Sequence, residues 1–267
     1  MKLNIVPART GLLWVKLGIR TFFKQPVALT GLFFLFMAVA SVASFIPVLG
    51  SVLALALLPA ITLGFMVATQ QAAEGKFPMP VLMLAAFRAE RQRAKDMLVL
   101  GLLYAAGFLL IMGLTSVLDG GQFAKLYLLG GSINQELVLQ PSFQSAMWLA
   151  LALYTPFSLL FWHAPALVHW YGLGPAKALF FSAVACWRNL GAFTLYGGLW
   201  MGLFLSVGLL ASLVGALMGS PGLLASILAP LALMLAAMFF SSIYFSFRDN
   251  FVTEAPANAD PLSSTFR

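Results

Sequence analysis

Residues 26–70 read PVALTGLFFLFMAVASVASFIPVLGSVLALALLPAITLGFMVATQ and contain no Asp, Glu, Lys or Arg. A helix that crosses a bilayer needs about 20 mostly apolar residues, so this stretch can hold two such helices. Long uncharged stretches recur at 97–118, 137–176 and 189–247. Because 61% of the residues are hydrophobic and only 9% are charged, the sequence predicts an all-α membrane protein rather than a soluble one.

The same composition argues against several kinds of site. The chain has a single cysteine, Cys186, and no Cys/His cluster with the spacing of a metal site. The uncharged stretches contain no protease or hydrolase motif and no pair of acidic residues. We therefore expect no metal, no cofactor and no enzymatic activity. The formal charge of +7 is expected to reflect the basic cytoplasmic loops of a membrane protein rather than binding to nucleic acid.

The uncharged stretches predict six membrane-spanning helices, at 27–46, 49–70, 97–118, 144–168, 190–217 and 222–245. With this assignment, all of the 15 Lys and Arg residues except Lys125 lie on one side of the membrane. Both termini are then predicted to be cytoplasmic, because basic residues accumulate on that side. Residues 1–250 are expected to form one transmembrane domain, followed by a disordered cytoplasmic tail at 251–267. The first span is expected to stay uncleaved, because the basic segment before it is long for a signal peptide.

Three basic clusters precede spans and are expected to face anionic lipid headgroups on the cytoplasmic side. Their principal members are Arg20, Lys24, Arg88, Arg91, Lys95 and Arg188. At about 100° per residue, the basic residues of the first cluster share one helix face, and Trp14, Gly18 and Phe22 lie opposite. Helical patterns also occur around 83–95 and 176–189. These patterns predict amphipathic helices in the plane of the membrane interface.

The clusters also suggest a parallel repeat of three units, each with an interfacial helix, a span, an outer turn and a second span. The second span of each unit carries a central proline that is expected to kink it, namely Pro59, Pro156 or Pro230. Identity between the units is low, so the alternative is that prolines and basic helices recur by chance.

With Ala-Cys-Trp-Arg-Asn at 185–189 opening the third unit, this pattern resembles a family of uncharacterised proteobacterial inner-membrane proteins. It is more distantly similar to the membrane domain of some bacterial glycerophosphoryl diester phosphodiesterases. The resemblance covers about 10–250 and implies a bacterial inner-membrane location. It implies no activity, because the phosphodiesterase domain with its catalytic His and acids has no counterpart in this sequence.

One titratable side chain, His163, falls deep within a predicted span. Such residues are candidate functional sites by default, so His163 could contact a proton or a substrate. The favoured alternative is a neutral histidine that bonds to a carbonyl freed by a nearby proline or lies near the inner interface. The absence of acidic residues from the spans argues against ion-coupled transport.

Small residues of the fifth span are expected to pack helices closely, namely Gly198, Gly202, Gly215 and Gly219. Packing within the chain is favoured over a homo-oligomer. In the apolar outer loop at 119–143, glycine pairs frame a short segment that is expected to cap the bundle, the alternative being a lid over an outer cavity.

Two functions are compatible with this sequence. The first is a non-enzymatic membrane protein that organises lipid or partner proteins. The second is a transporter or channel for a neutral or apolar solute. A continuous polar-lined cavity near the three prolines would favour transport, and a closed centre filled with Leu and Phe would argue against it.

Overall fold

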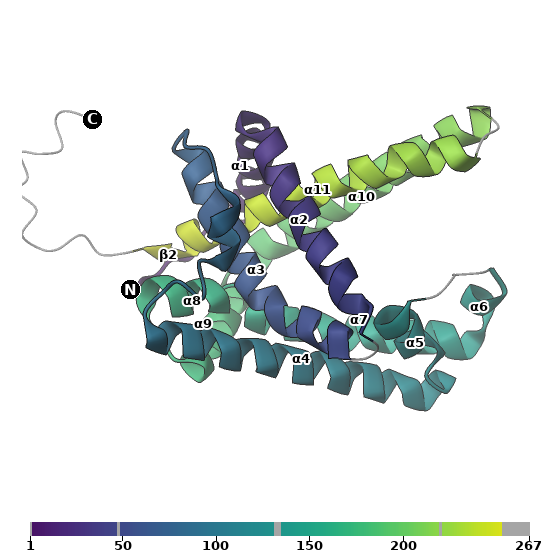
Figure 1. Cartoon of the computed structure of the whole chain (residues 1–267), viewed down its shortest axis with the longest axis horizontal. Helices are drawn as coiled ribbons and strands as arrows, with labels where there is room; N and C mark the ends of the chain where they lie inside the picture. The colour runs from purple at the N-terminus through teal and green to yellow at the C-terminus, as the bar shows by residue number, and fades with distance from the viewer. Residues whose placement is uncertain (1, 47–48, 131–134, 219–220, 253–267) are drawn as a thin grey trace, which may run out of the picture.

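A computed structural model describes residues 2–46, 49–130, 135–218 and 221–252. The described chain is helical apart from two short strands and one 3-10 turn (Figure 1). Its elements in chain order are β1 (Lys2–Leu3), α1 (Thr10–Lys24), α2 (Pro26–Ser44), α3 (Leu49–Ala73), η1 (Pro80–Leu84), α4 (Arg91–Asp119), α5 (Gln122–Leu129), α6 (Gln135–Leu139), α7 (Pro141–Phe161), α8 (Ala164–Tyr171), α9 (Pro175–Arg188), α10 (Leu190–Met218), α11 (Pro221–Asn250) and β2 (Phe251–Val252).

The prediction of six membrane-spanning segments is confirmed. Among the described residues, six segments are long and apolar enough to cross a membrane, formed by α2, α3, α4, α7 with α8, α10 and α11. The third begins at Arg91 instead of 97, and α11 continues to Asn250 instead of ending at 245.

The fourth span is not the continuous helix predicted at 144–168. Helix α7 ends at Phe161, and α8 begins at Ala164 with His163 as its N-cap residue. Pro165 is the second residue of α8. Because proline has no N–H and its ring clashes with the preceding turn, it suits the first turn of a helix better than the interior.

Two of the three predicted amphipathic helices are present, as α1 and α9. The prediction of a helix around 83–95 is wrong. The chain forms η1 and a turn before α4, and Arg91 and Lys95 belong to the first turns of α4 itself. The three-unit repeat is not confirmed. Each predicted proline lies inside its helix, but Pro59 is buried whereas Pro156 and Pro230 are exposed.

Trp14, Gly18 and Phe22, on one face of α1, are buried against protein, and the expected position of α1 in the membrane interface stays a prediction. Trp14 lies with its ring centroid 5.2 Å from that of Phe193, and its indole N–H donates to Asp249 at 3.0 Å. Gly18 lies against α11 so closely that a Cβ atom would overlap Ser242. The basic residues of α1 lie on its exposed face, as predicted.

The first and last described residues, 2–3 and 251–252, lie side by side at one end of the molecule. Strand β1 pairs antiparallel with β2, which places Leu3 opposite Phe251. Asn189, at the junction of α9 and α10, accepts a hydrogen bond from the Val6 amide at 2.8 Å and donates to the Asn4 carbonyl at 3.1 Å. Residues 251–252 therefore belong to the folded domain rather than to the predicted tail, and 253–267 lie outside the described residues.

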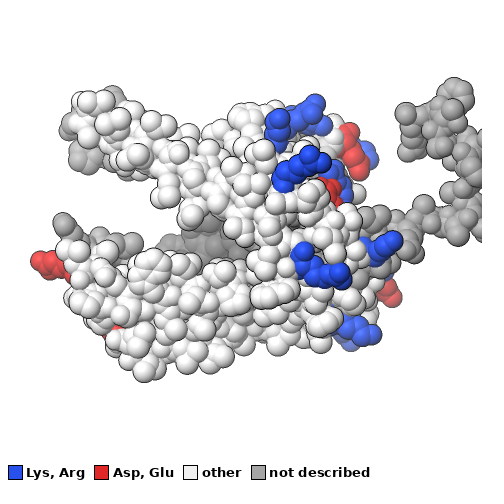
Figure 2. Space-filling view, turned by 180° about the vertical axis from the view of Figure 1, so that it is seen from behind, with Lys and Arg blue, Asp and Glu red and all other residues white. Residues whose placement is uncertain are grey.

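Charge and packing both concentrate at this end, which we call the basic end. Lys and Arg side chains gather there on the face shown in Figure 2, and the rest of that face is almost uncharged. Away from the basic end, the α10–α11 pair diverges from α4 and α7 (Figure 1). Only 17% of the residues in the apolar window of α10 are buried within the protein. Most of this helix is therefore left to contact lipid or another protein within the membrane.

Helix α5 covers the outer ends of α4 and α7. The Asp119 carboxylate accepts hydrogen bonds from the Gly121 and Phe123 amides at 2.8 and 2.6 Å. Phe123 packs against Phe143 at 5.6 Å, and the Ser51 hydroxyl donates to Leu128 of α5 at 2.6 Å. These contacts hold α5 against the bundle, and because a cavity of about 410 Å³ also borders α5, the cap and the lid both stay predictions. Gly120, Gly121 and Gly130 all have positive φ angles, which explains the framing glycines.

Candidate functional site

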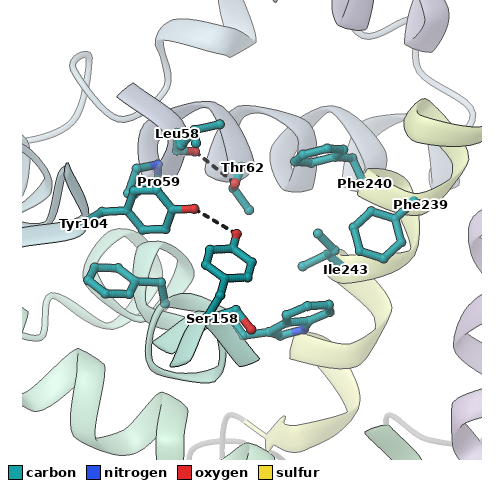
Figure 3. Close-up of a pocket in the computed structure, with 11 residues that line it drawn as sticks. Leu58, Pro59, Thr62, Tyr104, Ser158, Phe239, Phe240 and Ile243 are labelled. Atoms are coloured by element: carbon teal, nitrogen blue, oxygen red, sulfur yellow. Dashed lines mark hydrogen bonds between the residues drawn. The ribbon is translucent and has the colours of Figure 1, made fainter. Parts of the chain in front are cut away.

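A cavity of about 380 Å³ lies between α3, α4, α7 and α11, near the middle of these helices. We call it the central pocket, and Figure 3 shows the side chains that point into it. Its lining residues are Leu58, Pro59, Thr62, Tyr104, Tyr154, Ser158, Phe161, Trp162, Phe239, Phe240 and Ile243.

The central pocket has apolar walls and a few hydroxyl groups. The hydroxyls of Tyr104 and Tyr154 lie 3.0 Å apart and share a hydrogen bond (Figure 3). Thr62 donates to the Leu58 carbonyl at 2.9 Å, and Ser158 donates to the Thr155 carbonyl at 2.8 Å. A bond between two hydroxyls uses only one of their two hydrogens. The tyrosine pair can therefore still donate to a ligand, whereas Thr62 and Ser158 already donate to their own helices.

Aromatic contacts hold these walls in place. The Phe161 ring lies edge-on to Tyr104 at 5.0 Å, and Phe240 packs on Phe65 at 5.2 Å. The Trp162 indole donates to Ser246 of α11 at 3.1 Å. These contacts involve all four helices that surround the central pocket, so its walls are fixed by packing within the protein.

The described residues do not form the polar-lined cavity near all three prolines that would favour transport. Only Pro59 lines the central pocket. Pro156 lines a separate apolar groove of about 490 Å³ that also contacts Trp187 of α9, and Pro230 lies on the exposed surface of α11. The centre is therefore neither a polar-lined passage near the three prolines nor a closed apolar core.

His163 lies at the basic end rather than in the central pocket. It is fully buried, with its Nε2 atom 3.2 Å from the Asn250 side-chain nitrogen and its ring 5.5 Å from that of Phe251. Its backbone N–H donates to Ser182 at 2.9 Å, and the Ser182 hydroxyl donates to Leu159 at 2.8 Å. These bonds bridge the break between α7 and α8. The geometry favours a structural histidine near the interface over a substrate contact.

The predicted headgroup-facing residues are exposed, in agreement with their expected position. They are Arg20, Lys24, Arg88, Arg91, Lys95 and Arg188. The Lys24 ammonium also donates to the Ala73 carbonyl at 2.9 Å, which joins the ends of α1 and α3. Contact with lipid headgroups stays a prediction.

Two of the four glycines predicted to pack helices, Gly198 and Gly202, have no close neighbour among the described residues. Gly198 and Gly202 are exposed, and no described atom lies within 4 Å of a Cβ added to either. Gly215 is buried, and Gly219 lies outside the described residues. Close packing occurs instead at Gly101, where a Cβ would overlap the Ala56 carbonyl oxygen. A homo-oligomer stays a prediction.

Sequence reasoning missed Tyr104, Tyr154 and Asn250. Tyrosine in an otherwise apolar span is a usable signal, but the pairing of two tyrosines from different helices is visible only in the structure. Asn250 was missed because the charged Arg248 and Asp249 suggested that the last span had already ended. Among the described residues, no three His, Cys, Asp or Glu side chains gather as metal ligands would.

Comparison with known proteins gives one informative relative. No protein-family model matches the chain, and no solved structure matches it. A probable inner membrane protein of Burkholderia thailandensis is 36% identical over 259 residues, which cover 96% of each chain. With this identity and six helices able to cross a membrane, the chain is an integral membrane protein and belongs to the family of this proteobacterial inner membrane protein.

Proposed function

We propose that this protein is a non-enzymatic inner-membrane protein that binds a lipid, or another largely apolar molecule, in the central pocket. The observation that carries the proposal is the chemistry of the lining, in which a tyrosine hydroxyl pair lies within apolar walls. Apolar walls suit a hydrocarbon chain. The hydroxyl pair suits one ester, carbonyl or hydroxyl oxygen on that chain, since polar groups in lipid need a hydrogen-bond partner.

The lining supports binding rather than catalysis. General acid–base chemistry uses a group such as His, Asp, Glu, Lys or Tyr within hydrogen-bond reach of the reacting atoms. Of these, only tyrosine lines the central pocket, and no His, Asp, Glu or Lys of the lining could exchange a proton with it. We also propose that the basic end faces the cytoplasm, where Lys and Arg side chains gain about 1 kcal/mol each near an anionic surface.

A pocket-filling variant tests the proposal. Ser158→Phe places a ring in the central pocket, and Ser206→Phe makes the same change on the exposed face of α10. The full chain is reconstituted with a phospholipid that carries a photoreactive group in its acyl chain, and the cross-linked peptides are identified by mass spectrometry. We expect cross-links in the peptide around Thr62, lost in Ser158→Phe and kept in Ser206→Phe. Equal cross-linking of that peptide in both variants would contradict the proposal.

The second candidate is a transporter for a neutral or apolar solute. Its support is the position of the pocket, which lies among four spanning helices instead of on one outer surface. Vesicles containing the protein would then take up an apolar fluorescent solute faster than empty vesicles, and Ser158→Phe would abolish the difference. Binding without faster uptake would favour the first function.

A further inference from the structure

A second pocket, of about 330 Å³, lies at the basic end and has a different lining. We call it the terminal pocket. Gln70 and Arg248 line it together with five aromatic side chains from α8, α11 and β2, which are Trp170, Tyr171, Tyr244, Phe247 and Phe251. It therefore lies where the apolar spans meet the charged end, at the depth where lipid head groups meet aromatic side chains.

The aromatic walls of the terminal pocket form one packed unit. Trp170 stacks on Phe247 with ring centroids 5.1 Å apart, and Phe247 packs on Phe251 at 5.4 Å. Tyr244 contacts Trp170 at 6.2 Å. Trp170 and Tyr244 are only half-buried, so part of each ring faces the pocket. Aromatic faces attract cations, and tryptophan and tyrosine do so more strongly than phenylalanine.

Arg248 supplies a cationic group that is held in place. Its guanidinium binds the Asp249 carboxylate through Nε at 2.9 Å and Nη2 at 2.8 Å. The same group lies 5.1 Å from the centre of the Phe245 ring. Each of these two bonds uses one of the five guanidinium N–H groups, and the side chain is 47% exposed. Arg248 can therefore still donate to a phosphate oxygen.

An anionic group lies beyond the opposite wall. The Glu74 amide donates to the Gln70 carbonyl at 3.2 Å, so Glu74 follows Gln70 by one helical turn and lies on the same side of α3. Its carboxylate forms an exposed ion pair with Lys76 at 2.7 Å. The terminal pocket thus combines aromatic faces and an arginine, and the Glu74–Lys76 ion pair lies beyond its wall at Gln70.

We propose that the terminal pocket binds a phosphate ester that carries an ammonium group, as in the head group of phosphatidylethanolamine. The ammonium would lie against Trp170 and Tyr244 on the side of Glu74, and the phosphate would bind Arg248. An anionic head group such as that of phosphatidylglycerol would satisfy Arg248 but would offer no cation to the aromatic faces. This site is separate from the central pocket and does not depend on the function proposed there.

Lipid retention by the intact protein tests the site. The full chain, purified in detergent, is given equal amounts of phosphatidylethanolamine and phosphatidylglycerol with the same acyl chains, and bound lipid is counted by native mass spectrometry. We expect one phosphatidylethanolamine to be retained about tenfold more than phosphatidylglycerol. Tyr244→Leu and Arg248→Gln should each remove most of this preference. Tyr244→Phe keeps the ring and should keep the preference.

Matched variants separate the site from general charge effects. Arg188→Gln removes an exposed basic residue that does not line the terminal pocket, and it should leave the preference unchanged. Ser158→Phe in the central pocket should also leave the preference unchanged. The proposal for the terminal pocket can therefore be contradicted without contradicting the one for the central pocket. Equal retention of both lipids, an equal loss in Arg188→Gln and Arg248→Gln, or an equal loss in Tyr244→Phe and Tyr244→Leu would overturn the proposal.

A competition experiment identifies the source of the ligand. Soluble phosphoethanolamine carries the same phosphate and ammonium groups without acyl chains. Displacement of the bound lipid by this compound would support the site and show that the head group alone is recognised. If phosphoethanolamine does not displace the lipid, but Tyr244→Leu and Arg248→Gln still lose the lipid preference, the site is supported and the acyl chains contribute to binding.

Discussion

His163 and Asn250 form a buried polar pair that joins the start of α8 to the end of α11. His163→Ala would leave the Asn250 amide without this partner, which costs about 1–3 kcal/mol in addition to the cavity left by the ring. We expect a lower free energy of unfolding in detergent–SDS mixtures for either single alanine variant. If the pair interacts, the double variant should lose about 1 kcal/mol less than the two single losses combined. Strict additivity would contradict the pairing.

Cys186 is expected to be unreactive in the folded protein. It is fully buried on α9, where its thiol lies 3.8 Å from the Leu159 carbonyl. Burial raises the pKa of the Cys186 thiol, and because the thiolate is the reactive form, raising the pH from 7 to 9 should barely speed its reaction. Maleimide labelling, followed by the mass of the protein, should be complete only after denaturation. A Lys177→Cys variant in a Cys186→Ala background offers an exposed control on the same helix and should label rapidly.

The glycines of the helices fall into two classes that differ in their neighbours. At Gly11 and Gly101 an added Cβ would overlap a backbone carbonyl of a neighbouring helix, whereas at Gly198 it would meet no described atom. We therefore expect Gly101→Ala to lower the free energy of unfolding by about 1–3 kcal/mol, because two backbones must move apart. Gly198→Ala should be neutral or stabilise the helix by up to about 1 kcal/mol. Unfolding in SDS mixtures measures the free energy of unfolding of both variants. Equal changes would show that the close approach of the two backbones at Gly101 does not contribute to stability.

Two errors in the predicted elements have identifiable causes. The break at Trp162–His163 had a sequence signal in Pro165, which marks the first turn of a helix more often than its middle, but the long apolar stretch concealed it. The helix expected around 83–95 came from a periodicity that in fact belongs to the start of α4. Periodicity alone cannot show where a helix begins when the next helix continues the same pattern.

At the scale of the whole molecule, the spans were predictable because lipid excludes charged side chains, so the charge-free stretches mark them directly. The two pockets were not predictable from the sequence. The central pocket depends on Tyr104 and Tyr154 meeting across two helices, and the terminal pocket brings together Gln70, Trp170 and Tyr244. These contacts between side chains of different helices depend on the angles at which the helices cross. In lipid, local packing contacts decide those angles rather than the overall hydrophobic pattern.

The direction in which the molecule crosses the membrane follows from its charges. Strands β1 and β2 place Lys2–Leu3 and Phe251–Val252 at one end, and α5, which carries Lys125, lies toward the other (Figure 1). Basic segments near spans resist translocation, so the end with nearly all the Lys and Arg should stay cytoplasmic. Alkaline phosphatase, which folds only outside the cytoplasm, should be inactive when fused after Val252 and active when fused after Gly130. A fluorescent protein that needs the cytoplasm should give the opposite pattern. Active phosphatase after Val252 would show that the basic end is translocated and would contradict the proposed contact with cytoplasmic head groups.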